Sequence, residues 1–485
     1  MPYNIKINCI YINIAKLRKR GAFSMSETVT PINSSFNPDQ AIQMLCEQSR
    51  KNNYISPEKF PLYQVKRGLR NADGSGVIAG LTRVCNVHGY VMNEGEKSPE
   101  EGLLVYRGYN LEDLVNACHQ EDRFGFEEIA WLLLFGQLPT KEQLGHFTRT
   151  ISHFQTLPDS FVDDVIIKHP SANIMNTLQR ATLALYSFDD NPEDQSLENV
   201  MQQAISIIAK MPIFMSSAYQ AKRRAVDKKS MYFHQPRDNL SVAENILRMM
   251  RSHKRFTDAE AKMLDICLLL HAEHGGGNNS TFATRVLTSS GTDTYSAIAA
   301  SIGSLKGFRH GGANAKVMSQ LDTVKAGVSN WEDQTEIESF LEKIMDKKAG
   351  DGSGLIYGMG HAVYTISDPR AKMLKKYAER MVAGTEHEKE YRLIENIEKL
   401  APGVFARKKN TDAPLCANVD LYSGMVYSAL RLPPETYTPL FAVARTVGWC
   451  AHRIEEIQTA GSKIIRPAYR PVIRSAEYLP LSSRS

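Results

Sequence analysis

The stretch "TDAEAKMLDICLLLHAEHGGG", from Thr257 to Gly277, decides the fold class. Thr257 is a residue type that caps helix N-termini, and Glu260 three residues later completes a capping box. Apolar residues then recur at helical spacing until three glycines end the pattern. The stretch therefore predicts a helix with His271 and His274 on one face, because residues three apart are neighbours on a helix surface.

The same helical pattern continues through most of the chain. Cap residues at Asn110 and Thr140 precede two more helical stretches, and residues 333–348 and 439–457 have the pattern of further helices. Strand signals are few, and the clearest is "GSGVIAGLTRVCNVHGYVM", which starts at Gly74. Strands and helices do not alternate regularly, and no internal repeat is visible. We therefore expect a mainly α fold with at most a small β-hairpin near residues 75–105.

The composition is that of an ordinary soluble globular protein. The chain has 485 residues, of which 42% are hydrophobic and 23% charged, so it is long enough for more than one domain. No run approaches the roughly 20 apolar residues that cross a bilayer, so we expect no membrane partner. The seven cysteines include no C-x-x-C pair, which disfavours a disulfide framework or a zinc ribbon. They favour buried thiols in a reducing compartment, and we expect a cytoplasmic protein.

The net charge of +5 comes from the first residues of the chain. Residues 1–24 contain five basic residues and no acid, and without those five the chain has 53 basic and 53 acidic residues. We therefore expect no nucleic-acid partner. Residues 1–30 are predicted to form a disordered basic leader. An upstream start codon or a disordered tail explains this leader better than a targeting segment, because its apolar part precedes its basic cluster.

Two histidines lie beside glycine-rich turns. His274 precedes Gly275 in "HAEHGGG", which is not the H-E-x-x-H pattern of a zinc protease, and a helix-capping histidine is the plain alternative. His310 lies in "SLKGFRHGGANAKVM", just before a predicted helix. A helix N-terminus disfavours the histidine cation, and a neutral imidazole can donate a hydrogen bond to a carbonyl oxygen that is becoming an enolate. The plain alternative is a histidine on a surface loop.

A third histidine and three arginines extend this set. In "YGMGHAVYTISDPR", His361 lies on a glycine-rich loop and Arg370 follows it; G-x-G-H is not a dinucleotide-binding pattern, and an Arg fork suits a carboxylate. Arg445 lies inside an apolar helical run and needs an anionic partner, whereas Arg466 lies outside regular helix. Structural salt bridges are the plain alternative for these arginines.

Asp420, in "CANVDLYSGMVY", is the candidate general base. A carboxylate in partly apolar surroundings can have its pKa adjusted by burial to suit proton abstraction. A helix cap is the plain alternative for an isolated aspartate. Together the histidines, this acid and the arginines suit chemistry on a small multi-carboxylate substrate with a carbonyl that must be polarised. They do not suit a metal site, since clustered acids and cysteines are missing.

Seven stretches, in this order, resemble the citrate synthase family. They are "GLLVYRGYNLEDL", "HAEHGGGNNSTFATR", "GSLKGFRHGGANAKV", "GMGHAVYTISDPR", "NVDLYSG", "FAVARTVGWCAHRIEE" and "IRPAYRP", and the resemblance covers about residues 76–470. The resemblance implies a two-domain helical fold, with a large domain formed by residues 31–309 and 419–485 and a small domain formed by residues 310–418. It also implies a homodimer that condenses acetyl-CoA with oxaloacetate and hydrolyses the thioester to citrate and CoA. No metal, redox group or other tightly bound cofactor is implied, and acetyl-CoA serves as cosubstrate.

The resemblance also implies roles for individual residues. Asp420 resembles the base that removes a proton from the acetyl methyl, and His310 resembles the donor to the thioester oxygen. His361 resembles the histidine that polarises the oxaloacetate carbonyl. The implied oxaloacetate ligands are His274, Arg370, Arg445 and Arg466, and Arg466 is expected to reach into the site of the partner subunit.

The CoA contacts are expected mainly from a backbone segment. Some members of the family carry basic residues just after the loop histidine, where this chain has Ala362 and Thr365. CoA must then bind elsewhere. The expected contacts are Leu355, Tyr357, Gly358, Gly360, Lys306 and Asn418. Lys316 and the run Arg407–Lys409 are further basic candidates for the CoA phosphates.

Two alternatives stay open. A 2-methylcitrate synthase would use the same residues with propionyl-CoA, because one methylene changes selectivity by only ~1–3 kcal/mol. A non-catalytic relative that serves as a binding or structural protein is the other alternative. The intact trio of His310, His361 and Asp420 argues against it.

Overall fold

The computed structural model describes residues 37–94, 96–473 and 475–484. The predicted basic leader, residues 1–30, lies outside the described residues. Contacts divide the chain into two compact units, Met1–Leu69 and Arg70–Ser485. The chemistry predicted above falls entirely in the second unit.

The first unit contains helices with no buried residue. Its elements are α1 (Pro38–Asn52), α2 (Lys59–Leu62) and η2 (Arg67–Leu69). Asn37 caps α1, because its side chain accepts hydrogen bonds from the backbone N–H groups of Asp39 and Gln40. Proline at the first helical position suits the start of α1, where its missing N–H has no intrahelical partner to lose.

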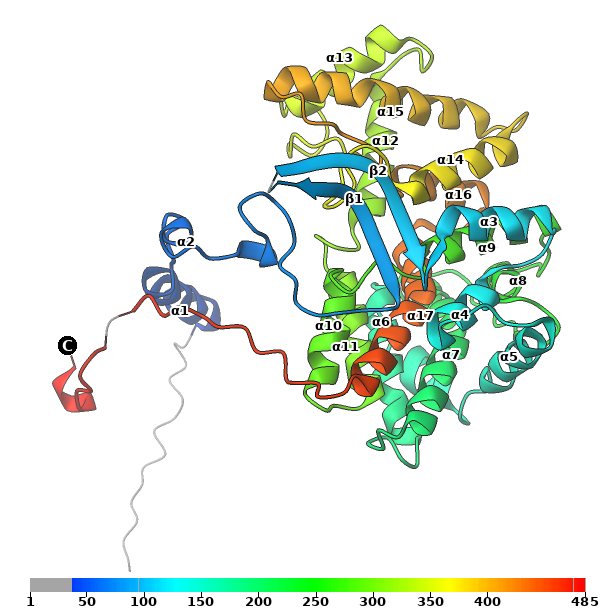
Figure 1. Ribbon diagram of the computed structural model, residues 1–485, viewed down its shortest axis with the longest axis horizontal. Helices are drawn as coiled ribbons and strands as arrows, with labels where there is room; N and C mark the ends of the chain where they lie inside the picture. The colour runs from blue at the N-terminus through cyan, green and yellow to red at the C-terminus, as the bar shows by residue number, and fades with distance from the viewer. Residues whose placement is uncertain (1–36, 95, 474, 485) are drawn as a thin grey trace, which may run out of the picture. The chain divides into compact units, whose positions relative to one another are not determined.

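The second unit begins with a small antiparallel sheet, as predicted (Figure 1). Its strands are β1 (Cys85–Asn93), β2 (Glu96–Tyr106) and β3 (Tyr109–Asn110), in the order β1-β2-β3. The register shifts between His88 and Tyr90. A Cβ at Gly89 would lie 3.0 Å from the carbonyl oxygen of Val363, so glycine lets this hairpin pass close to the loop that carries His361.

Helices form most of the rest of the second unit, so the mainly α prediction is confirmed. They are α3 (Leu111–Gln120), α4 (Phe126–Phe135), α5 (Lys141–Phe154), η3 (Val162–Ile167), α6 (Ile174–Ala184), η4 (Leu185–Phe188), α7 (Leu197–Ala225), α8 (Val242–Met250), α9 (Asp258–His271), α10 (Asn279–Ser289), α11 (Thr294–Lys306), α12 (Ala313–Gly327), α13 (Gln334–Met345), α14 (Pro369–Val382), α15 (Glu388–Lys409), α16 (Asp420–Ala429), η5 (Pro434–Thr436), α17 (Tyr437–Gln458) and η6 (Leu481–Ser483).

Helix α9 starts as predicted and ends earlier than predicted. The capping box between Thr257 and Glu260 is formed. The prediction that His271 and His274 share a helix face is wrong, because α9 ends at His271. The backbone N–H of Glu273 donates a hydrogen bond to the hydroxyl of Tyr106 at 3.2 Å. That hydroxyl in turn donates to the carbonyl of Glu273 at 2.9 Å. This hydrogen bonding turns the chain out of the helix just before His274.

Helix α17 is the centre of the packing. It contacts α4, α7, α9, α10 and α11, and Trp449 is among its fully buried side chains. A second group of contacts joins α13 to α15, α12 to α16 and α14 to α16. Figure 1 shows α13, α14 and α15 together at the top of the view. Only the short segment 430–436 connects α16 to α17, so residues of both groups meet there.

The search for membrane-spanning segments gave a negative result over the described ranges. None of the helices there combines the length and the hydropathy that crossing a bilayer requires.

Candidate active site

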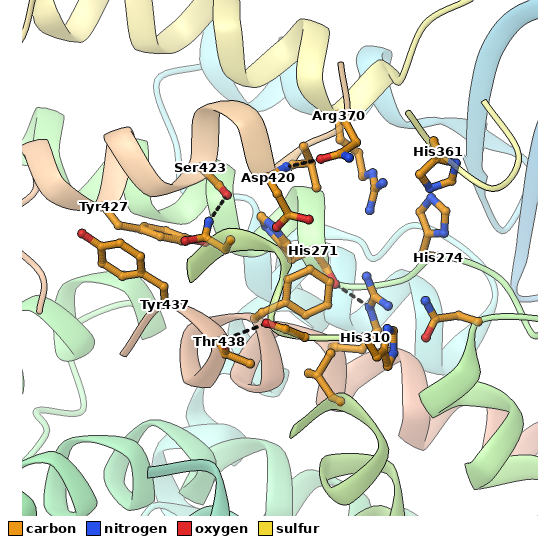
Figure 2. Close-up of a pocket in the computed structure, with 18 residues that line it drawn as sticks. His271, His274, His310, His361, Arg370, Asp420, Ser423, Tyr427, Tyr437 and Thr438 are labelled. Atoms are coloured by element: carbon orange, nitrogen blue, oxygen red, sulfur yellow. Dashed lines mark hydrogen bonds between the residues drawn. The ribbon is translucent and has the colours of Figure 1, made fainter. Parts of the chain in front are cut away.

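One cavity of about 160 Å³ brings together most of the predicted site residues (Figure 2). Its walls come from α9, α11, α12, α14, α16, α17 and the loops between them. The lining residues are His271, His274, Asn278, Leu305, His310, Gly311, Asn314, His361, Arg370, Asn418, Val419, Asp420, Ser423, Tyr427, Tyr437, Thr438, Phe441 and Arg445. The candidate base, the three candidate histidines and two of the three candidate arginines therefore share one space.

Asn418, one of the predicted CoA contacts, also lines this cavity, whereas the other predicted residues do not. Lys306, Leu355 and Arg466 are exposed, and the Tyr357 hydroxyl donates to Asp351 at 2.8 Å. The roles predicted for these residues, and for Gly358 and Gly360, stay predictions.

The glycine loop before His361 is nevertheless bound to the segment before Asp420. The Gly360 N–H donates to the carbonyl of Cys416 at 2.7 Å, and the Asn418 N–H donates to the carbonyl of Gly358 at 2.8 Å. Gly358 and Gly360 have φ of 85° and 87°, a conformation that glycine adopts without strain. The loop therefore carries His361 to the cavity that Asp420 lines.

Asp420 begins α16, and its N–H donates to the side chain of Asn418 at 3.0 Å. Burial raises the pKa of this carboxyl to about 6, with Asp368 raising it further and the charges of Arg370 and Arg445 opposing the shift. A carboxylate with a pKa near 6 is ionised at pH 7 and is a stronger base than an ordinary aspartate.

His310 is held in the turn before α12. Its Nε2 lies 3.2 Å from the hydroxyl of Ser280, and burial, together with the charge of Arg445, lowers its pKa to about 4. The imidazole is therefore neutral at pH 7. Ser280 also contacts Asn278 Oδ1 at 2.9 Å. Its single hydrogen goes to one of these two neighbours, and only donation to Nε2 leaves a hydrogen on His310 Nδ1.

His361 has a defined tautomer. Its Nδ1 accepts the backbone N–H groups of Val363 at 3.0 Å and Tyr364 at 3.1 Å, so a neutral ring carries its hydrogen on Nε2. The ring stacks on Tyr364 with centroids 4.6 Å apart and an interplanar angle of 25°. Burial and then the charge of Arg370 lower the pKa of His361 to about 4. The ring is thus a fixed neutral donor.

His274 lies next to His361 in Figure 2, with ring centroids 5.1 Å apart. Burial, followed by the charge of Arg370, lowers its pKa well below the usual value. Its Nε2 is buried and has no hydrogen-bond partner within the part of the chain that the structure describes. A ligand that fills the cavity can supply that partner.

The two cavity arginines differ in how they are held. Asp368 binds Arg370 through two hydrogen bonds, from Nε at 3.0 Å and from Nη2 at 2.7 Å, and also caps α14. Arg445 donates from Nε to the carbonyl of His271 at 2.7 Å. Both Nη atoms of Arg445 are buried without a partner among the described residues. A buried charged donor left unpaired is costly, so the site favours an anionic ligand here.

The sequence analysis missed several residues that shape this site. Asp368 lies inside the quoted "SDPR" stretch, and its local pairing with Arg370 was available from the sequence. Tyr427 follows Asp420 by seven residues, two helical turns, so helical spacing would have placed it on the same face. His271, Ser280 and Tyr364 gave no such signal, because their roles depend on contacts that form only in the fold.

A second cavity of about 550 Å³ meets the first at His274, His310 and His361. Strand β1 and the segment 275–279 form its other walls. Over the described ranges, no group of three or more His, Cys, Asp or Glu is placed to hold a metal ion.

The arrangement suits two operations on carbonyl compounds. Asp420 is an ionised acid placed beside neutral imidazoles, which suits removal of a proton next to a carbonyl whose oxygen receives a hydrogen bond. Arg370, Arg445 and His361 together suit a carboxylated ketone whose carbonyl is polarised.

Comparisons with known proteins agree with this chemistry. The family model for "Citrate synthase, C-terminal domain" matches residues 72–468. The citrate synthase of Synechocystis sp. is 32% identical over 411 residues, which cover 84% of this chain and 93% of that protein. 2-Methylcitrate synthase 1 of Corynebacterium glutamicum is 30% identical, covering 87% and 99%. The solved ternary complex of Thermoplasma acidophilum citrate synthase with carboxymethyl coenzyme A and oxaloacetate has a TM-score of 0.69 at 26% identity, covering 87% of this chain and 99% of that one.

Proposed function

Because the chain belongs to the citrate synthase family, an acyltransferase-type family, we propose that it condenses acetyl-CoA with oxaloacetate and hydrolyses the product thioester to citrate and CoA. One observation carries this proposal: Asp420, with its pKa raised to about 6, shares a cavity with Arg445, whose two Nη groups have no partner among the described residues. A base and an unfilled carboxylate site in one space suit the joining of a thioester to a keto dicarboxylate.

Oxaloacetate occupies the end of the cavity with the arginines. Its carboxylates pair with Arg370 and Arg445. This pairing gives the two unpartnered Nη groups of Arg445 their hydrogen-bond acceptors. The Nε2–H of His361 donates to the ketone oxygen, and the fixed tautomer of His361 supports this role. His274 supplies a further hydrogen bond from its unpartnered Nε2.

Asp420 removes a proton from the α-carbon of the acyl group. A thioester α-carbon is a weak acid, so the enolate needs a hydrogen bond at its oxygen as it forms. His310 donates that bond from Nδ1, which requires that Ser280 donate its own hydrogen to His310 Nε2. Losing one such donor typically costs about 10²–10³ in rate. The enolate carbon then attacks the oxaloacetate carbonyl.

The CoA portion is proposed to contact Leu355, Tyr357, Gly358, Gly360, Lys306 and Asn418. Two observations support this. Leu355 is 57% exposed, which leaves apolar surface free for a ligand. The solved relative from Thermoplasma acidophilum binds a CoA analogue and oxaloacetate together.

The larger assembly is also a proposal. We infer a large domain of residues 31–309 and 419–485, a small domain of residues 310–418, and a homodimer in which Arg466 enters the partner's site. The position of Arg466 supports the last point, since it is exposed and does not line the cavity of its own chain. The neighbouring Tyr469 and Ile473 are 91% and 85% exposed, which suits burial against a second subunit. The buried free thiols of Cys85, Cys267 and Cys450 support a reducing compartment such as the cytoplasm.

The test is release of free CoA thiol from purified protein with acetyl-CoA, in the presence and absence of oxaloacetate. We expect thiol release that depends on oxaloacetate. No release would contradict the proposal and favour a non-catalytic relative.

The second candidate function is 2-methylcitrate synthesis from propionyl-CoA. It is favoured by the matches to two Corynebacterium glutamicum proteins of that name, each 30% identical. Comparing kcat/KM for acetyl-CoA and propionyl-CoA separates the two. A clear preference for propionyl-CoA would replace the first proposal with the second.

A further inference from the structure

The cavity has two chemically different ends (Figure 2). Arg370 and His361 lie at one end, Tyr427 and Tyr437 lie at the other, and Asp420 lies between them. The first end is polar and cationic. The second end combines the rings of Tyr427 and Tyr437 with the hydroxyl side chains of Ser423 and Thr438, and the proposed mechanism gives the two rings no role.

The two ends follow from two consecutive helices, α16 and α17. In α16, Asp420 and Tyr427 are seven residues apart, two turns along the same face. In α17, Tyr437 and Phe441 are four residues apart on one face, and Arg445 follows after another four. The short connection 430–436 brings Tyr427 and Tyr437 together, with ring centroids 5.2 Å apart. The aromatic pair therefore forms where this short connection joins the two helices, and Asp420 and Arg445 each lie further along their own helix.

The aromatic end is a packed wall. Tyr427 and Tyr437 are 2% and 4% exposed, and both belong to the hydrophobic core of the protein. Close-packed interiors do not yield easily to added volume, because extra methylenes force side chains or backbone to shift. Carbon atoms that reach the two rings therefore meet a fixed limit.

The geometry of the reaction determines which part of the substrate faces this wall. The acyl α-carbon must lie against the Asp420 carboxylate, and the keto dicarboxylate occupies the cationic end. An acyl chain longer than acetyl carries additional apolar carbons beyond the α-carbon. Those carbons are better accommodated against aromatic rings than beside paired charges.

We infer that Tyr427 and Tyr437 limit the length of the acyl chain and so set the selectivity of this enzyme among acyl-CoA substrates. The inference rests on the proposed condensation of an acyl-CoA with oxaloacetate. It assigns the choice between acetyl-CoA and longer acyl-CoA thioesters to two residues that do not take part in proton transfer.

The test compares kcat/KM for acetyl-, propionyl- and butyryl-CoA at saturating oxaloacetate. In Tyr427→Leu, and separately in Tyr437→Leu, loss of the ring opens the aromatic end. We expect the ratio of kcat/KM for the longer thioesters to that for acetyl-CoA to rise about tenfold or more, since one methylene in an apolar pocket is worth about 10–200-fold. Tyr427→Phe keeps the ring and is expected to keep the wild-type ratio. The KM for oxaloacetate is expected to stay unchanged, because the cationic end is untouched.

Tyr391→Leu is the matched control. Tyr391 is fully buried and contacts the ring of Tyr422, but it does not line the cavity. This substitution removes a similar ring from the core and is expected to leave the acyl-CoA ratio unchanged. A ratio that shifts equally in Tyr391→Leu would show general loosening and overturn the inference.

The remaining outcomes are also decisive. Suppose that both leucine variants turn over acetyl-CoA, and that their ratios of kcat/KM for the longer thioesters to kcat/KM for acetyl-CoA stay within twofold of the wild type. This result would overturn the inference and leave the proposed function intact. If circular dichroism shows that one leucine variant fails to fold, the acyl-CoA ratio of the other leucine variant tests the inference. No thiol release by the wild-type protein with any acyl-CoA would instead refute the proposed function, and the inference with it.

Discussion

Helix α17 carries two buried arginines in two regions, and the regions differ in how many hydrogen-bond partners they offer the guanidinium group. Arg445 and Arg453 are 0% and 1% exposed, and burial lowers the pKa of each guanidinium to about 10. Around Arg453 all three nitrogens donate, to the hydroxyls of Thr294 and Thr288 and to the carbonyl of Thr292. The Arg445 guanidinium lies over the Phe441 ring, and within the described chain only its Nε has a hydrogen-bond partner.

The difference is the one we expect between a structural arginine and the proposed binding one. Burial and charge are the same, so neither identifies the function. The threonine region satisfies its guanidinium inside the protein, whereas the cavity region leaves two donors for a ligand. An unpaired buried donor is a cost to folding that a substrate carboxylate removes on binding. Substitutions in the two regions test this distinction.

The largest effect is expected in the cavity region at Asp420. Asp420→Ala removes the proposed base, and we expect thiol release to fall by about 10³-fold or more. Oxaloacetate should still bind, because Arg370 and Arg445 remain, and it should still raise the melting temperature. Turnover within tenfold of the wild type would exclude Asp420 as the base.

The next largest effect is expected for Arg445→Gln. It removes the unpaired donors, and we expect kcat/KM for oxaloacetate to fall about 10²–10³-fold, the loss typical of a charged contact to the reacting substrate. Stability should change little, since the lost guanidinium makes a single hydrogen bond in the described structure. A large loss of stability with unchanged kinetics would place Arg445 in the structural class.

Arg453→Gln is expected to have the opposite effect to Arg445→Gln, because it should lower stability and leave activity nearly unchanged. It removes donors from Thr288, Thr294 and the carbonyl of Thr292, and we expect unfolding in urea to show a loss of about 2–5 kcal/mol. The kcat/KM of the folded protein should stay within about twofold of the wild type. If Arg453→Gln instead weakened oxaloacetate binding as much as Arg445→Gln, the contrast between the two regions would fail.

The smallest effect concerns pH. Proton abstraction needs ionised Asp420, so kcat/KM should be half its maximum near pH 6 and fall tenfold per pH unit below it. His310 and His361, with pKa lowered to about 4, stay neutral through that range and add no second step. A profile that is flat from pH 8 to pH 5 would contradict the raised pKa of Asp420.

The same shift has a consequence for stability. The pKa of Asp420 is higher in the folded protein than the ordinary aspartate value of 3.8, so the folded state holds its proton more tightly. The stabilisation of the folded protein by the protonated Asp420 side chain is fully present below about pH 4. It is lost as the pH rises through about 6. Asp420→Asn removes this loss. Its stability relative to the wild type should therefore increase between pH 4 and pH 7, as measured by urea unfolding.

Local features of the fold could be predicted from the sequence. The capping box of Thr257 and Glu260 depends on residues three apart, so the start of α9 was predictable. The end of α9 was not, because Tyr106, which binds Glu273, is 167 residues away. The hairpin was predicted near residues 75–105, and its strands begin only at Cys85.

The sequence predicted some of the residues that line the cavity, but it did not predict their pKa shifts or which polar groups lack partners. The motifs named Asp420, His310, His361 and Arg445, and the fold brings them to one cavity. The sequence does not show which of the two arginines is satisfied inside the protein, although Arg445 lies in an apolar run and Arg453 lies beside His452 and Glu455. Only the threonines of a distant segment make the difference. The domain boundaries, the dimer and the CoA contacts stay predictions.

We propose that Arg445 is a buried cation whose two unpartnered Nη groups bind a carboxylate of the substrate. The most direct test is the dissociation constant of oxaloacetate, measured by titration calorimetry on the wild type and on Arg445→Gln without acyl-CoA. We expect binding to the variant to be at least tenfold weaker. Equal dissociation constants would contradict the claim.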